Sequence, residues 1–125
     1  MTILTQWELE PRVIVTTYTH SPTLNDLRNA NANIIAHIRA GTPPVHHVLD
    51  ATQLHALPLQ MPELLDTLSF IYEDGFGWQV FVGRDHIVRF LAEAITRLTD
   101  ANIELVSTLE AGLEFLFEVD SSLHA

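Results

Sequence analysis

Residues 78–98 read WQVFVGRDHIVRFLAEAITRL, and this stretch decides the class of fold. The β-branched and aromatic run from Trp78 to Val82 is typical of a core strand, and Gly83 ends it. Apolar residues then recur at helical spacing, at Ile87, Phe90, Leu91, Ala94, Ile95 and Leu98. A strand followed at once by an amphipathic helix predicts a repeating unit of an α/β fold.

The same alternation continues on both sides of this stretch. Upstream, Val45 to Asp50 predicts a strand, and an apolar stripe from Leu64 to Tyr72 predicts a helix. Downstream, Ile103 to Val106 predicts another strand, and Thr108 is placed to cap a last helix. We expect the residues from Asp120 to Ala125 to form a flexible tail.

The N-terminal third supplies two further strands and one helix. Trp7 to Glu10 and Val13 to Tyr18 are close enough in sequence to form an antiparallel hairpin. A helix is expected between Thr23, which suits an N-cap, and Gly41, which ends it. The chain therefore predicts a single α/β domain over residues 1–125 with the order β-β-α-β-α-β-α-β-α and a mixed, largely parallel sheet.

The amino-acid composition excludes several kinds of catalysis and metal binding. Its 125 residues are about enough for one domain, and they include no cysteine, which excludes disulfides, thiol catalysis and cysteine metal sites. All six basic residues are arginine. Without lysine, Schiff-base catalysis and a P-loop are excluded as well.

The net charge and the hydropathy of the chain argue against nucleic acids and membranes as partners. The formal net charge is −10, and so acidic a chain repels the phosphate backbone of nucleic acids. No segment reaches the length of a membrane span, and the first ten residues lack the basic flank of a signal peptide. We therefore expect a cytoplasmic protein that binds neither nucleic acid nor membrane and needs no cofactor.

Three stretches carry a resemblance to a known family: Val45–Asp50, Gly77–Gly83 and Val106–Leu116. Together with the order of elements, they resemble the STAS domain family, and within it the SpoIIAA-like branch of anti-sigma-factor antagonists. The resemblance spans residues 7–117. It implies a SpoIIAA-like fold and a regulatory role through contact with other proteins.

The phosphorylation switch of that family is not carried over. In antagonist STAS domains, the strand that ends in Asp leads to a phosphorylatable serine in an Asp-Ser-Ser-Gly-like motif. Alignment of that strand on Asp50 places Pro58-Leu59-Gln60-Met61 at the motif, with no hydroxyl among them. Thr52 is the only hydroxyl in the loop, and it lies too early. The resemblance still implies that this loop and the helix after it form the contact region.

The loop after Asp50 is more apolar than surface loops normally are. Two readings stay open, because such a loop either folds back onto the helices or contacts another molecule. In the second case the partner is another protein or a second copy of the chain, which predicts a homodimer. The predicted partner-binding residues are Asp50, Thr52, Leu54, Leu57, Leu59 and Met61.

The pair His46-His47 is the first candidate for chemistry. Neighbouring residues of a strand point to opposite faces of the sheet, so the two side chains cannot share one metal ion. We therefore predict no metal site. We expect one histidine to be packed and hydrogen-bonded and the other to be exposed.

Asp50 and Arg84 are the other candidates, and each has two readings. Asp50, at the carboxyl end of a central strand, suits a general base, or it caps the following turn. Arg84 precedes a helix whose first amides could help it to bind an anion, or it lies in a tight turn with Asp85 as the N-cap.

No catalytic set assembles from these residues, and this absence favours a non-enzymatic interaction module. The alternative is a small-molecule-binding protein or an enzyme with a pocket near Asp50 and His55. Convergence of a histidine with Asp50 in a closed cavity would favour the alternative.

Overall fold

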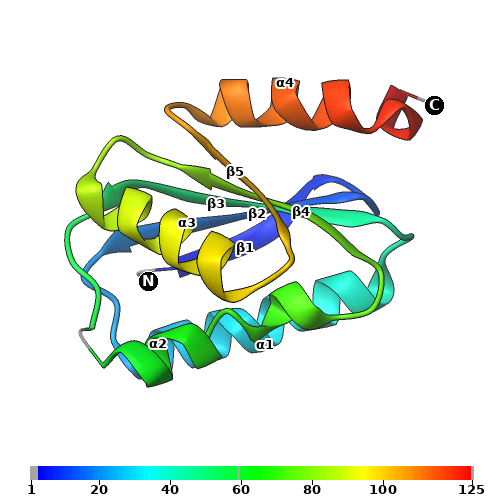
Figure 1. The fold of residues 1–125 in the computed structure, drawn as a ribbon. Coiled ribbons are helices and arrows are strands. Elements are labelled where there is room, and N and C mark those ends of the chain that lie inside the picture. Colours follow the sequence, from blue (N-terminus) through cyan, green and yellow to red (C-terminus); the bar gives the residue numbers. More distant parts are fainter. Residues whose placement is uncertain (1–2, 59, 125) are drawn as a thin grey trace.

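The computed structural model describes residues 3–58 and 60–124, which form one five-stranded sheet between two helical layers (Figure 1). The spatial order of the strands follows their order in the chain. The first two strands pair antiparallel, and all other neighbours pair parallel. The strands are β1 (Ile3–Leu9), β2 (Val13–His20), β3 (Val45–Leu54), β4 (Phe76–Val82) and β5 (Asn102–Val106).

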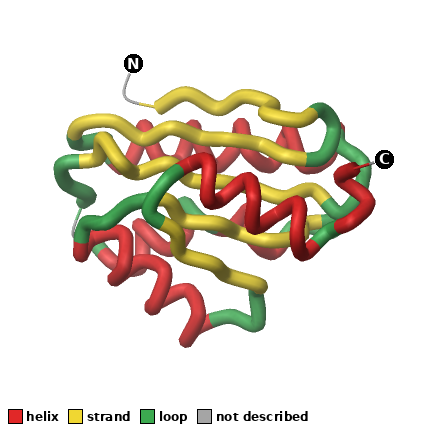
Figure 2. Tube along the Cα trace, turned by 90° about the horizontal axis from the view of Figure 1, so that it is seen from above, coloured by secondary structure: helices red, strands yellow, loops and turns green. Residues whose placement is uncertain are grey.

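The helices divide unevenly between the two faces of the sheet. Each connection between parallel neighbours crosses over with the same hand, so all the crossover helices cover one face. The segment after β5 returns over the other face, and among the residues that the structure describes it supplies all of the helical cover there (Figures 1 and 2). The first layer holds α1 (Leu24–Ala40), α2 (Met61–Asp66), the 3₁₀ turn η1 (Ser69–Tyr72) and α3 (His86–Leu98). The second holds α4 (Leu109–Val119) and the 3₁₀ turn η2 (Ser121–His124).

This architecture confirms the predicted order and the mixed, largely parallel sheet. Local sequence sets the helix starts as expected. The hydroxyl of Thr23 accepts the N–H of Asp26, and the Asp26 carboxylate accepts the N–H of Thr23 in return. Asp85 and Thr108 cap the starts of α3 and α4, where their side chains accept the N–H groups of Ile87 and Ala111. Among the described residues, no helix is both long and apolar enough to cross a bilayer.

The predicted helix from Leu64 to Tyr72 is wrong, because two shorter elements replace it. The Thr67 hydroxyl donates to the Leu64 carbonyl, and α2 ends there. The side chain of Asn31 on α1 then accepts the N–H of Phe70 at 3.1 Å and donates to the Ser69 hydroxyl at 2.9 Å. These tertiary bonds hold residues 69–72 as a 3₁₀ turn, since they occupy groups that a longer helix would use.

The expectation of a flexible tail is also wrong for the described part of that segment. Residues 121–124 form η2, and Leu123 is buried beneath it. Leu123 packs with Val13, Val15 and Leu116 in the core on the α4 side of the sheet. A second and larger core lies on the other side, under α1, α2 and α3.

A chain of hydrogen-bonded polar groups, most of them buried, runs across the sheet through His47. The Nδ1–H of His47 donates to Gln79 Oε1 at 2.7 Å, and the Gln79 amide donates onward to the Val80 carbonyl. His47 Nε2 therefore accepts the hydroxyl of Thr16 at 2.8 Å, and Thr16 in turn accepts that of Thr5 at 3.1 Å. Four neighbouring strands are linked by this chain, which leaves His47 neutral. Burial lowers the pKa of His47 to about 4.

We expect the protein to lose stability when His47 is forced to protonate. Its pKa lies below the usual value of 6.5, so the unfolded chain binds the proton more readily. The stabilisation is complete above about pH 6.5 and is lost as the pH falls toward 4, by about 3 kcal/mol in free energy of unfolding. Urea unfolding across this pH range measures the loss of stability, and NMR titration of the His47 ring tests whether protonation of His47 causes it. A free energy of unfolding that stays level down to pH 4 contradicts the expectation.

Candidate functional site

An apolar groove lies at the carboxyl edge of the parallel strands. Because β3 and β4 run side by side in the same direction, the loop after β3 meets the first turns of α3 there. The groove has a volume of about 450 Å³. It is lined by Ala56, Leu57, Pro58, Met61, Leu64, His86, Ile87, Phe90 and Leu91. We call this surface the apolar groove.

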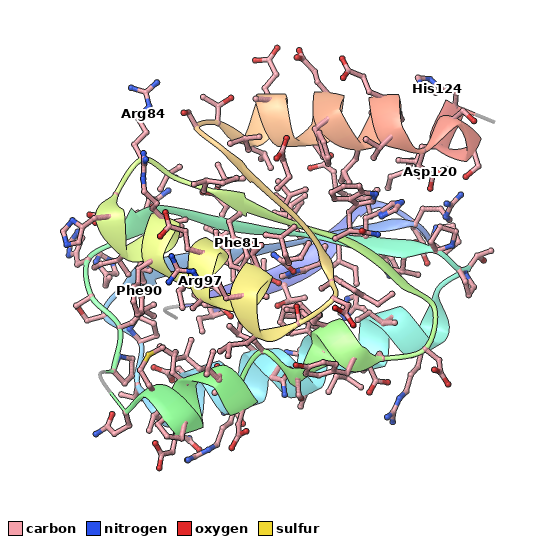
Figure 3. All side chains as sticks on the ribbon, in the orientation of Figure 1. Phe81, Arg84, Phe90, Arg97, Asp120 and His124 are labelled. Carbon is pink, nitrogen blue, oxygen red and sulfur yellow. The ribbon has the colours of Figure 1, made fainter. Side chains whose placement is uncertain are left out.

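Phe90 forms one wall of the groove, and its exposure was not predicted from the sequence. The apolar arc of α3 is wider than the face that the sheet covers, so Leu91 and Ile95 are buried while Phe90 is 54% exposed. Leu98, two turns further along the helix, is also exposed. Figure 3 shows Phe90 on α3, in front of the sheet that carries Phe81. The helical spacing of the apolar residues was visible in the sequence, but which of them face the sheet was not.

The apolar loop after β3 follows the first of its two readings, and contact with another molecule stays a prediction. Leu54 is buried at the end of β3. Leu57 and Met61 pack against the core, yet they keep part of their surface in the wall of the groove. Leu59 lies outside the described residues. The loop therefore folds back onto the helices and still presents apolar side chains at the edge of the sheet.

Asp50 and Thr52 both lie within β3, which runs on to Leu54, so the predicted end of this strand at Asp50 is wrong. Asp50 Oδ1 accepts the N–H of Thr52 at 3.0 Å and its hydroxyl at 2.7 Å. These bonds lie inside the strand, where its register against β2 shifts, so the reading of Asp50 as the cap of a following loop is wrong. His55 stacks edge-on against His20, with ring centroids 5.5 Å apart, and the hollow near Asp50 has no histidine in its described lining.

Arg84 lies in that separate hollow, beyond the ends of β3, β4 and β5. Its side chain is exposed, and it shares the wall with Thr52, Ser107 and Thr108. Asp85 lines the same hollow while it caps α3 through the N–H of Ile87. The N-cap reading of Asp85 is confirmed, and anion binding by Arg84 stays a prediction.

Both members of the histidine pair are buried, so the expectation that one is exposed is wrong. His46 points to the α4 side, opposite to His47. Its Nδ1 accepts the N–H of Trp78 at 2.9 Å, and its Nε2–H donates to Asp120 at 2.7 Å. A methyl group at Gly77 would collide with this ring. Within residues 3–58 and 60–124, no group of three histidine or acidic residues is placed to hold a metal ion.

Asp120 is the residue that joins α4 to the sheet. It accepts from Arg12 at 2.8 Å and from His46, and its other oxygen accepts from Ser122. The hydrogen bonds from Ser122 and His46 lower the pKa of Asp120 to about 2. Burial lowers the pKa of His46, so the ring stays neutral as the donor to Asp120. The sequence offered one signal for an ordered segment here. It is Asp-Ser-Ser at residues 120–122, because Asp and Ser favour turns in which the side chain bonds to the nearby backbone.

No protein-family model matches this chain, and no curated protein is found to match it. Among solved structures, it is similar to the crystal structure of an uncharacterized DUF3478-family protein from Shewanella loihica PV-4, which has a SpoIIAA-like fold. The TM-score is 0.68, and the match covers 91% of each chain at 14% sequence identity. The fold is therefore SpoIIAA-like, as the sequence resemblance implied. The neighbour has no characterised activity to compare.

We expect replacement of Asp120 by Asn to loosen α4 from the sheet. The carboxylate accepts hydrogen bonds from Arg12, His46 and Ser122, whereas an amide has one accepting oxygen and no charge. Hydrogen bonds to charged groups contribute about 1.5–3 kcal/mol each. A loss of about 2 kcal/mol in free energy of unfolding is expected, with faster amide exchange in residues 120–124. Asp100→Asn is the matched control, because Asp100 is exposed at the end of α3. Equal behaviour of the two variants contradicts the role assigned to Asp120.

Proposed function

We propose that this chain is a non-enzymatic interaction module of SpoIIAA-like fold that forms a homodimer through the apolar groove. One observation carries the proposal: the groove and the exposed ring of Phe90 occupy the same patch of surface. An apolar projection beside an apolar hollow is an arrangement that favours association.

Self-association is favoured because this patch can be complementary to itself. In a two-fold symmetric dimer, the same surface of each copy contacts the other, so it has to supply both a projection and a hollow. Phe90 supplies the projection, and the space between Leu57, Met61 and Ile87 supplies the hollow. Aromatic side chains that fill apolar pockets are the usual energetic centre of such interfaces.

The non-enzymatic reading is supported by what the candidate catalytic groups already do. The carboxylate of Asp50 accepts two hydrogen bonds from Thr52. The two nitrogens of His46 are occupied by Trp78 and Asp120, and those of His47 by Gln79 and Thr16. A general base needs a free nitrogen or oxygen within reach of its substrate.

Docking at this groove is proposed to be constitutive rather than switched by phosphate. Residues 53–66, which run from the end of β3 through α2, contain no serine and no threonine. The next hydroxyl, on Thr67, is buried and donates to the Leu64 carbonyl. A phosphoryl group at this position would have to displace the core.

We expect Phe90→Asp to abolish the dimer and to leave the fold intact. The new carboxylate would have to be desolvated in the partner's groove, which costs several kcal/mol, whereas in the monomer the site is open to water. Size-exclusion chromatography with light scattering measures the change from dimer to monomer. Tyr72→Ser is the control, because it removes an aromatic side chain that is 70% exposed away from the groove.

A second variant tests the opposite wall of the groove. Leu57→Asp is expected to give the monomer as well, since Leu57 lines the hollow that receives Phe90. A wild-type chain that is monomeric at high concentration, or a dimer that survives both aspartate variants, refutes the proposed interface.

A small apolar ligand is the second candidate occupant of the groove. Its volume of about 450 Å³ lies within the range of ligand pockets, roughly 300–1,000 Å³. Native mass spectrometry of the purified protein distinguishes the two functions. A monomer that retains a small molecule, which Phe90→Asp releases, favours the ligand; an unliganded dimer favours self-association.

A further inference from the structure

The outer surface of α4 combines two stripes of different chemistry. Leu109, Leu113 and Phe117 recur every four residues and remain partly exposed along a shallow hollow. The carboxylates of Glu110, Glu114 and Glu118 line the same hollow with the same spacing. This surface lies on the opposite side of the sheet from the apolar groove (Figures 1 and 3). We call it the α4 acidic face.

The acidic stripe works against the stability of its own helix. Like charges four residues apart repel each other, and Glu118 in the last turn opposes the helix dipole. No arginine occurs in α4 or η2. Within residues 3–58 and 60–124, none of the three carboxylates forms an ion pair. Among the described residues, no basic side chain neutralises the negative charge of these three glutamates.

The apolar stripe forms a continuous row of side chains along α4, beside the glutamates. Three side chains at positions i, i+4 and i+8 form a ridge inclined to the helix axis, which rises about 12 Å at 1.5 Å per residue. A row of this kind accepts the apolar side of another helix. At the end of α4, His124 packs on Phe117 with ring centroids 5.0 Å apart and extends the row.

From these stripes we propose that the α4 acidic face binds a cationic amphipathic helix of another protein. The partner's apolar residues would lie along Leu109, Leu113 and Phe117, and its lysine or arginine side chains would pair with the glutamates. The net charge of −10 favours encounter with a basic partner and disfavours a second copy of this acidic chain on this face. This inference does not depend on dimer formation at the apolar groove.

A designed peptide tests the inference directly. The probe is a fluorescein-labelled helix of about five turns, with leucine on one side and lysine on the other. Its fluorescence anisotropy is measured with the full chain at low and at physiological ionic strength. We expect saturable binding that weakens as salt is added, because surface charge pairs are screened.

Two pairs of substitutions give the matched comparison. The double variant Glu114→Lys and Glu118→Lys is expected to weaken binding at least tenfold. Glu63→Lys with Asp66→Lys changes the net charge equally on exposed positions of α2, and is expected to weaken binding by less than about threefold through net charge alone. Circular dichroism confirms the fold. If the lysine pair on α4 fails to fold, Glu114→Gln with Glu118→Gln takes its place, with a loss of several-fold expected.

Three results would overturn the inference: no binding by the wild type, equal weakening by the two double variants, or equal affinity for a scrambled peptide of the same composition. Equal affinity for the scrambled peptide would mean that net charge alone drives the contact. A further variant, Leu113→Asp, separates the apolar row from the charge and is expected to remove the preference for the amphipathic peptide.

Discussion

The buried pair His46-His47 at the centre of β3 is the constraint on which the two layers of this protein depend. The two rings point to opposite faces of the sheet, and each needs partners for two nitrogens because neither is in contact with water. His47 finds them along the sheet in Gln79 and Thr16. His46 finds them in the backbone of β4 and in Asp120, at the end of α4. One dipeptide therefore aligns the strands on one face and anchors the covering helix on the other.

The uneven cover of the sheet explains where apolar surface remains. On the crossover side, α2 has only six residues and gives way to a 3₁₀ turn, so α3 is not flanked by a long helix. The outer arc of α3, including Phe90, stays exposed beside the apolar groove. On the other side α4 and η2 supply the helical cover within the part of the chain that the structure describes, and the outer surface of α4 carries the acidic and apolar stripes. The two exposed surfaces thus differ in chemistry, one nearly neutral and one strongly anionic.

Local patterns predicted the parts of the fold that depend on neighbours in sequence. The strand from Trp78 to Val82 and the caps at Thr23, Asp85 and Thr108 were all readable, because each depends on residues close together in the sequence. The predictions that were wrong concern segments whose structure depends on residues far away in the sequence. The predicted helix across residues 64–72 broke because Asn31, far away in the chain, binds residues 69 and 70. The predicted tail folded because Asp120 meets partners more than seventy residues away.

By itself, the sequence determined the class of fold, the order of its elements and the absence of thiol and lysine chemistry, because periodicity and composition act locally or do not depend on structure at all. Only the tertiary structure decided which apolar residues are left uncovered. Phe90 and Leu91 are neighbours with the same hydrophobic character, yet one is exposed and the other buried. Neighbouring residues of a helix point about 100° apart. The face of α3 that packs on the sheet therefore covers Leu91 and leaves Phe90 beside the short helix α2, and the spacing of residues along α3 does not encode which face that is.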